Sequence, residues 1–273
     1  MVRPINQIAE WEADAVFNLG PVPVPDLTGK TILVTGAGKG IGAALVRVLA
    51  DHGARVFAGC HDGADIAAAQ GIEAFALDVT DQEAVRAAVT RVEDRDGKLD
   101  VLVNNAGIIT PIGKFETLAS DSLGAAFDVN VISLHRMTLA CLPLLTASRG
   151  TVVNAGTGAA TTAMEGWTAY CTSKAAARMM TMMMDEELSA YGINSFFIGI
   201  PPTDTAMQGE IRKAGLNPIS KIAQSDLISP EIPARVMAWL CSDAAKTLET
   251  CCLDVRDPFF TEMMDLSPAP SAR

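Results

Sequence analysis

The chain has 273 residues, of which 49% are hydrophobic and 19% charged, so it is long enough to cover both faces of one large sheet. Its formal net charge of −11 would repel phosphate backbones and anionic membrane surfaces, which argues against nucleic acid and membrane as partners. Within the first thirty residues, Glu10, Glu12 and Asp14 stand where a signal peptide would need an apolar core. The six cysteines form no CxxC pair, which favours a reducing, cytoplasmic location.

The amino-terminal segment differs in composition from the rest of the chain. Residues 1 to 26 have no clear hydrophobic period and end in a Pro-Val repeat, Pro21 to Pro25. Prolines fix φ and remove a backbone donor, so this run favours an extended path over a helix or a central strand. We expect an arm over 1–26, one α/β domain over 27–260 and a tail over 261–273.

Short apolar runs alternate with amphipathic segments along the remaining chain. The runs predict strands at Thr31–Thr35, Arg55–Ala58, Glu73–Leu77, Leu99–Val103, Thr151–Asn154, Ser195–Ile198 and Cys251–Val255. The segments predict helices at Ile41–Ala50, Asp81–Val92 (capped by Thr80 or Asp81), Ser122–Leu145 and Trp167–Ala190. This alternation predicts a doubly wound, mostly parallel sheet with helices on both faces.

A glycine-rich turn, Thr35 to Gly42, joins the first strand to the first helix with the spacing T-G-x-x-x-G-x-G. Such a turn lets backbone N–H groups at a helix start face a pyrophosphate, although an ordinary strand-to-helix turn has similar residues. The spacing resembles that of the short-chain dehydrogenase/reductase family, and further landmarks follow in the family's order from Thr28 to about Pro258. The resemblance implies a Rossmann-type single domain, a nicotinamide cofactor, no metal, and hydride transfer between the cofactor and a small-molecule carbonyl or alcohol.

The landmarks after the turn include an aspartate and an asparagine motif. The resemblance gives Asp78 and Val79 the adenine-binding role, although Asp78 could instead cap the next helix. Asn104 to Gly107 matches the family's N-N-A-G, which stabilises the sheet and lines the ribose side. The cofactor contacts implied in this way are Gly36, Gly38, Lys39, Gly40, Ile41, Gly42, Cys60, His61, Asp78, Val79, Asn105, Ala106, Gly107, Tyr170, Lys174 and Thr205.

Tyr170 and Lys174 are the strongest candidates for the reacting centre. Residues four apart share one helix face, so the phenol and the ammonium can share a site, although an exposed amphipathic pair has the same spacing. A neighbouring cation favours the phenolate and lowers the pKa of a tyrosine. The resemblance makes Tyr170 the general acid/base, and makes Lys174 the group that lowers its pKa and holds the nicotinamide ribose.

Two further residues complete the catalytic set that the resemblance implies. Asn130 matches the family asparagine that holds a relay water at a helical kink, although it could instead satisfy its own helix neighbours. Thr157 stands thirteen residues before Tyr170, where the family has a serine that hydrogen-bonds the substrate oxygen. Threonine keeps this hydroxyl, while its methyl group restricts χ1 and narrows the pocket.

The chain departs from the family pattern after the sixth strand and at its end. Ile200-Pro201 stands where the family has Pro-Gly, and the nicotinamide-contacting threonine then falls on Thr205; another register assigns these roles to Gly199 and Thr203. Val255 to Pro258 replaces a terminal glycine pair that supports tetramer packing in the family. We expect a homodimer or homotetramer, with the methionines at 179–184 in the core or at the subunit interface.

The end of the second strand bears on cofactor choice. An acidic residue there would bond the ribose hydroxyls of NAD and repel the extra phosphate of NADP. The position holds Cys60 followed by His61, and Lys39 lies in the glycine turn, so we expect NADP(H) in preference to NAD(H). Asp62 next to these residues argues in the opposite direction.

The substrate side has only weak landmarks. The segments around Trp167 and Asp204 resemble the sepiapterin- and benzil-reductase-like branch, which reduces carbonyls and diketones. Segments near 108–115 and 207–227 are expected to form a mobile lid. A catalytically degenerate dinucleotide sensor or assembly protein is the alternative function, and an epimerase or dehydratase on the same fold is a third.

Overall fold

Seven parallel strands form one sheet in the order β3-β2-β1-β4-β5-β6-β7. The computed structural model describes residues 18–61 and 70–264. The strands are β1 Thr31–Thr35, β2 Arg55–Cys60, β3 Ile72–Ala76, β4 Val101–Asn104, β5 Thr151–Ala155, β6 Asn194–Gly199 and β7 Cys252–Asp254. The predicted doubly wound sheet is confirmed. Its strand order reverses between β1 and β4, which is where such sheets bind ligands.

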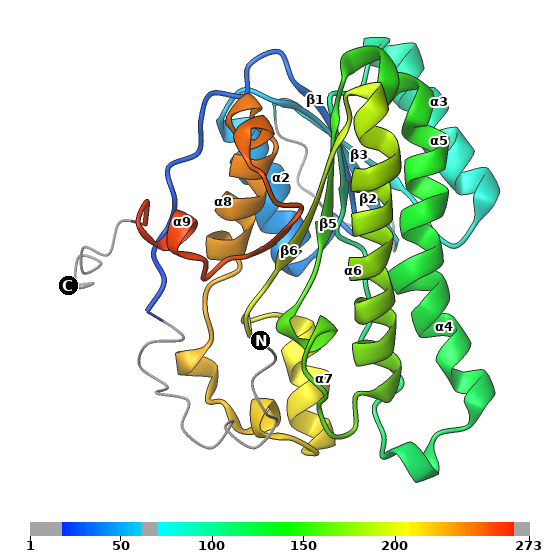
Figure 1. The fold of residues 1–273 in the computed structure, drawn as a ribbon, viewed down its shortest axis with the longest axis vertical. Helices are drawn as coiled ribbons and strands as arrows, with labels where there is room; N and C mark the ends of the chain where they lie inside the picture. Colours follow the sequence, from blue (N-terminus) through cyan, green and yellow to red (C-terminus); the bar gives the residue numbers. More distant parts are fainter. Residues whose placement is uncertain (1–17, 62–69, 265–273) are drawn as a thin grey trace.

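Helices cover both faces of the sheet, as Figure 1 shows. α2 (Gly40–Asp51) and α8 (Glu231–Leu240) lie on one face. α3 (Gln82–Asp96), α5 (Ser133–Ser148) and α6 (Thr168–Leu188) lie on the other. Alternate residues of β1 point to opposite faces of the sheet. Because helices cover both faces, all of β1 is buried, which explains why its sequence is a largely apolar run without alternation.

Helix α8 has no counterpart among the helices predicted from the sequence. It packs closely against α2, and its Trp239 packs edge-on against Phe260. Seven of its ten residues are buried. Its last five residues, 236–240, are all buried, and a continuous apolar run of this length cannot be distinguished from a buried strand by its period alone. Pro233 within it further weakens the helical signal.

The predicted helix Ser122–Leu145 is instead interrupted. A 3₁₀ turn (Ser120–Leu123) leads into a short helix, α4 (Gly124–Phe127), then into a π turn over Asp128–Ile132, and α5 follows. By length and composition alone, Ser120–Ser148 could cross a membrane, a test that core helices of soluble proteins also pass. The inner face of α5 packs in the core beneath the sheet.

Residues 18–26 form no helix or strand, as their prolines predict, but they pack on the domain. Val22 is fully buried in the core cluster that contains α8, and its carbonyl oxygen accepts a hydrogen bond from Arg235 Nε at 2.9 Å. Figure 1 shows this segment in blue beside α8. We propose that the domain begins before residue 27. Residues 1–17 of the expected arm and 265–273 of the expected tail lie outside the described residues.

Candidate active site

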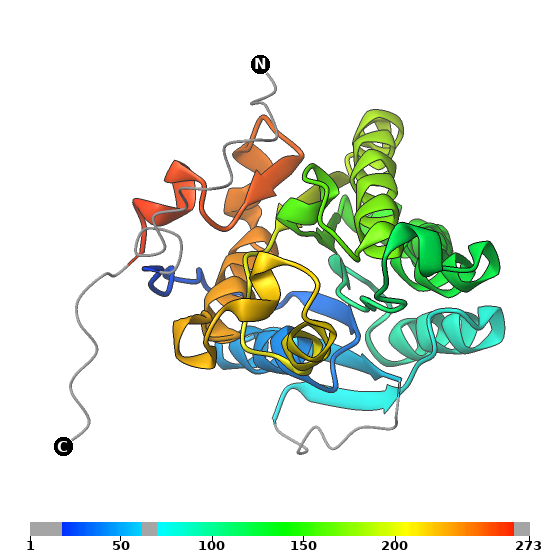
Figure 2. The ribbon, with the colours of Figure 1, turned by 90° about the horizontal axis from the view of Figure 1, so that it is seen from below.

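A cavity of about 940 Å³ opens at the carboxyl ends of the central strands. Its wall runs from the glycine turn after β1, past the ends of β4 and β5, to Trp167 at the start of α6. The segment that holds α7 (Ala206–Ala214) lies over this end of the sheet, in yellow in Figure 2. The cavity therefore lies at the sheet's switch point, where the fold predicts a ligand.

The glycine turn has the shape of a phosphate cradle. Gly36 and Gly40 have φ values of 62° and 54°, which glycine adopts without strain. A Cβ on Gly42 would overlap the Gly36 carbonyl oxygen, so the helix start can approach the turn closely only with glycine there. Lys39 is the N-cap residue of α2, and it lines the cavity together with the first residues of the helix, so the positive end of the helix dipole faces the cavity. No side chain caps this end.

Asn105 holds this cradle in place. Its Nδ2 donates to the carbonyl oxygens of Thr35 and Gly36 at 3.1 and 3.0 Å. In return, Thr35 Oγ1 accepts from the backbone N–H groups of Asn105 and Ala106, each at 3.1 Å. The N-N-A-G motif thereby ties the loop after β4 to the turn after β1, and Asn105, Ala106 and Gly107 all line the cavity.

Asp78 and Val79 line the other end of the cavity. Asp78 Oδ1 accepts hydrogen bonds from the Thr80 hydroxyl and backbone N–H, which hold the pKa of the carboxyl below its usual value. The alternative role as a helix cap is wrong, because Asp81 caps α3 by accepting from Glu83 N–H at 2.8 Å. Arg136 Nη1 donates to the Val79 carbonyl oxygen at 2.7 Å and fixes this loop from below.

Cys60 does not contact the cavity. Its side chain is 1% exposed, belongs to the core cluster under α2, and donates weakly to the Ala58 carbonyl oxygen. The prediction that Cys60 contacts the cofactor is therefore wrong for its side chain, because the pleat of β2 turns this side chain into the core. His61 and Lys39 are exposed and line the cavity, and His61 Nε2 lies 3.7 Å from Asp78 Oδ2. Asp62 lies outside the described residues.

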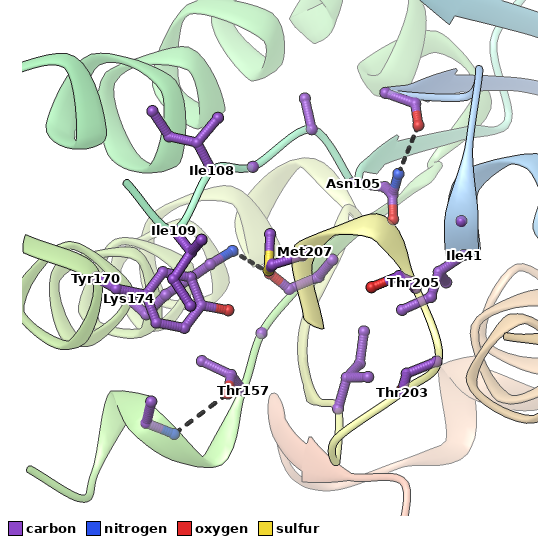
Figure 3. Close-up of a pocket in the computed structure, with 18 of the residues that line it drawn as sticks. Ile41, Asn105, Ile108, Ile109, Thr157, Tyr170, Lys174, Thr203, Thr205 and Met207 are labelled. Carbon is purple, nitrogen blue, oxygen red and sulfur yellow. Dashed lines mark hydrogen bonds between the residues drawn. The ribbon is translucent and has the colours of Figure 1, made fainter. Parts of the chain in front are cut away.

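Tyr170 and Lys174 share the inner face of α6, where they are only 7% and 6% exposed. The reading as an exposed amphipathic pair is therefore wrong. Figure 3 shows both side chains in the cavity wall, with Lys174 Nζ donating to the Ala155 carbonyl oxygen at 2.8 Å. The Tyr170 ring packs edge-on against Trp167, with centroids 5.6 Å apart.

Burial sets the proton affinities of this pair. It raises the pKa of Tyr170 to about 12, against the opposing effect of the nearby Thr157 side chain, and it lowers the pKa of Lys174 to about 8. The expected lowering of the Tyr170 pKa by Lys174 is not seen, because desolvation is the largest cause for both groups. In this state Tyr170 is a neutral phenol, ready to donate its proton.

The buried ammonium makes stability depend on pH. Because the pKa of Lys174 is about 8 in the folded protein and 10.5 ordinarily, its desolvation penalty is complete below pH 8 and disappears as pH rises to 10.5. Unfolding by urea between pH 7 and 10 should therefore show the wild type gaining stability relative to Lys174→Met. The gain should approach about 3 kcal/mol. Parallel stability curves for the two proteins would contradict this expectation.

Asn130 lies in the π turn with no exposed surface. Its amide accepts from Ile108 N–H and donates to the Ile108 carbonyl oxygen, each at 2.9 Å, and it also donates to Ser173 Oγ at 3.0 Å. Its side chain therefore bonds distant segments rather than its own helix neighbours. The expected helical kink is present, and Asn130 fixes the loop after Gly107 beside Lys174; its relay-water role stays a prediction.

Thr157 and Thr205 also line the cavity, Thr157 beside Tyr170. The Thr157 side chain lies close enough to Tyr170 to lower the pKa of the phenol, and it accepts a hydrogen bond from Ala159 N–H at 3.3 Å. Thr205 precedes α7, faces Gly40, and forms no side-chain cap, whereas the Thr203 hydroxyl already donates to the Pro201 carbonyl oxygen at 2.7 Å. Gly199 does not line the cavity, so the geometry favours the register that uses Thr205.

The two expected lid segments are tied together over the cavity. Gly113 N–H donates to the Gly166 carbonyl oxygen at 2.9 Å, and Lys114 pairs with Glu165 at 3.1 Å. Asn217 Nδ2, from the second segment, donates to the Glu165 carbonyl oxygen at 3.0 Å. Both segments thus contact the loop at Glu165 and Gly166 and cover the cavity; that they form a mobile lid stays a prediction.

The remaining walls of the cavity are mostly apolar, with one charged pair. The apolar walls come from Ile109, Met164, Trp167, Met207, Ile211 and Ile219, and the charged pair Asp254 and Arg256 closes one side. All of these apolar residues except Met164 fall in segments that the sequence already assigns to the substrate side, whereas Met164, Asp254 and Arg256 do not. Arg256 stands in the segment that replaces the family's glycine pair, and nothing in the sequence indicates that it faces the cavity.

Comparisons with known proteins agree with this geometry. The family model described as short chain dehydrogenase matches residues 30–215. The chain is 33% identical over 236 residues to benzil reductase ((S)-benzoin forming) of Saccharomyces cerevisiae, covering 78% of this chain and 90% of the relative. It is 31% identical over 227 residues to a 3-oxoacyl-[acyl-carrier-protein] reductase of Thermotoga maritima, covering 80% and 92%.

Solved structures give the same picture of the fold. A short chain dehydrogenase/reductase from Saccharomyces cerevisiae superposes with a TM-score of 0.77 at 23% identity, covering 87% of this chain and all of that one. A 3-ketoacyl-(acyl-carrier-protein) reductase from Brucella melitensis, complexed with NADH, gives a TM-score of 0.75 at 26% identity, covering 84% and 97%.

Proposed function

The chain belongs to the short chain dehydrogenase family, and from that premise we propose that it reduces a ketone or diketone, or oxidises the matching secondary alcohol, with NADP(H). One observation carries the proposal: Tyr170, Lys174 and Thr157 meet on one wall of a cavity whose other end is the glycine turn. For hydride chemistry a protein must supply a proton donor, a cation near it and a binding site for the nucleotide.

The cradle fits a dinucleotide, since Cβ atoms at Gly36 and Gly42 would fill the space between the turn and the loop after β4. Gly38 to Gly42 would hold the pyrophosphate, Asp78 and Val79 the adenine, and Lys174 and Thr205 the nicotinamide end. When bound, the nicotinamide supplies or accepts the hydride.

The protein's part in the reduction is to orient the carbonyl and supply a proton. Thr157 donates a hydrogen bond to the carbonyl oxygen, while the neutral Tyr170 hydroxyl gives that oxygen its proton as the carbonyl carbon becomes saturated. With substrate and cofactor in place, the ammonium of Lys174 on the same face of α6 would stabilise the phenolate that remains, although it does not lower the pKa of Tyr170 in the structure described here. Oxidation of an alcohol reverses these steps.

The preference for NADP(H) rests on two exposed basic side chains beside the adenosine end. Lys39 and His61 line the cavity where the ribose phosphate would lie, and the end of β2 offers no carboxylate among the described residues. Dissociation constants for NADPH and NADH, measured by fluorescence titration, would test this directly. Tighter binding of NADH would overturn the preference.

The substrate class rests on the apolar wall and on a relative. The wall around Trp167 suits an aryl or alkyl carbonyl, and one relative at 33% identity is a benzil reductase. We would follow the absorbance of NADPH and NADH with a panel of ketones and 1,2-diketones. Turnover supports the proposal, whereas tight cofactor binding without any turnover would favour a non-catalytic dinucleotide sensor.

We also propose that the protein is a homo-oligomer in solution. The methionines after Lys174 divide between the two expected roles: Met184 is buried in the core, while Met179, Met182 and Met183 are 36–55% exposed on the outer face of α6. Exposed apolar side chains in one stripe are typical of subunit interfaces. Sedimentation velocity measures the state, and a monomer at micromolar concentration would contradict this proposal.

A further inference from the structure

The wall of the cavity near Thr157 contains an arginine that the hydride chemistry does not use. Among the described residues that line the cavity, Lys39, Lys174 and Arg256 carry the lysine and arginine charges. Lys39 belongs to the glycine turn and Lys174 to Tyr170. Arg256, directly after β7, is left without a role in cofactor binding or proton transfer.

Arg256 is held in one orientation by Asp254. Its Nε donates to Asp254 Oδ1 at 2.7 Å and its Nη2 donates to Asp254 Oδ2 at 2.8 Å, a paired arrangement that fixes the guanidinium plane. The backbone N–H of Arg256 also donates to Asp254 Oδ1 at 2.9 Å. The guanidinium is thus positioned before any ligand arrives.

Two glycines make room for this pair. A Cβ on Gly199 would lie 2.5 Å from Asp254 Oδ2, so only glycine allows the carboxylate its present place. On the other side, the Cβ position of Gly158 is 3.6 Å from Arg256 Nη2. Because Gly158 directly follows Thr157 and has no side chain, the arginine is open toward the turn that carries the Thr157 hydroxyl.

The guanidinium has a second pair of donors beyond the pair that Asp254 occupies. Within the part of the chain that the structure describes, the fork formed by Nη1 and the outer N–H of Nη2 has no hydrogen bond, and the side chain is 29% exposed. A planar fork of two N–H groups matches the two oxygens of a carboxylate. Asp254 orients these donors without consuming them.

We propose that Arg256 binds a carboxylate of the substrate, so that the preferred substrates are keto acids, or the corresponding hydroxy acids. This inference rests on the proposed function and narrows its substrate class. Arg256 would act as a specificity-determining residue, with Asp254 as the residue that positions it. The apolar wall around Trp167 would then contact the carbon chain of the acid.

The test compares each acid with its methyl ester, which keeps the reacting carbonyl and removes the charge. Benzoylformate and 3-benzoylpropionate, each beside its ester, place the carboxylate at two distances from the ketone. We expect the wild type to favour at least one acid in kcat/KM. Arg256→Gln should lower that acid-to-ester ratio by about tenfold or more, since a charge-assisted pair of hydrogen bonds is lost.

Two further variants separate the fork from the charge. Arg256→Lys keeps a cation without the planar fork and should recover only part of the ratio. Lys213→Gln removes one positive charge from an exposed site on α7 outside the cavity wall, and should leave the ratio unchanged. Thermal unfolding of each variant confirms that the fold is retained.

The outcomes distinguish this proposal from the proposed function. If neutral ketones are reduced but the wild type favours neither acid, or the ratio survives Arg256→Gln, the carboxylate proposal is overturned and the reductase reading stands. If nothing is turned over, calorimetry of 3-benzoylpropionate binding with NADPH present decides. Binding that weakens in Arg256→Gln supports the anion site, and equal or absent binding overturns it.

Discussion

Tyr170→Phe is expected to lower carbonyl turnover by about 10²- to 10⁴-fold, the usual contribution of a general acid, with little change in cofactor affinity. The variant removes the only atom that could protonate the substrate oxygen in our proposal. Phenylalanine retains the ring that packs edge-on against Trp167, so the wall of the cavity keeps its shape. Steady-state rates and cofactor titration separate the two effects.

The chain provides a matched control, because it has only two tyrosines. Tyr191 is 54% exposed in the 3₁₀ turn that follows α6, outside the cavity wall, and Tyr191→Phe should keep wild-type rates. A Tyr170→Phe protein that retained more than a tenth of the wild-type rate would show that another group supplies the proton.

Gly42→Ala is expected to weaken binding of NADPH by at least about tenfold and to destabilise the fold by about 1–3 kcal/mol. The added Cβ would overlap the Gly36 carbonyl oxygen and lie 2.6 Å from Asn105 Nδ2. Both atoms belong to the network that shapes the cradle, so relief of the overlap must move the turn or break the Asn105 bonds. Urea unfolding without cofactor and NADPH titration measure the two effects.

Gly124→Ala is the control for this substitution. Gly124 has φ of −54° at the start of α4, and a Cβ there would meet no atom within 4 Å. Alanine should be neutral or add a fraction of a kcal/mol, because it reduces the freedom of the unfolded chain. Equal cofactor binding by Gly42→Ala and the wild type would refute the assignment of this turn as the cradle.

The sequence by itself determined the architecture and the main candidates for the site. Strands such as β1, buried on both faces, are continuous apolar runs, and the glycine turn and the Tyr170–Lys174 spacing are local patterns that one helix or one turn explains. The parallel sheet followed from the alternation of strands and helices, since parallel strands require crossover connections, whereas the order of the strands came from the tertiary structure.

Only the tertiary structure decided which side chains face the cavity and how burial changes their chemistry. Cys60 points into the core, Asn130 bonds a loop 22 residues away, and desolvation raises the pKa of Tyr170 where a neighbouring cation was expected to lower it. Arg256 comes beside Thr157 only because β7 adds to the edge of β6. Local sequence patterns specify individual helices and strands. Which side chains come together at the cavity depends on contacts between residues far apart in the chain, and no local pattern encodes those contacts.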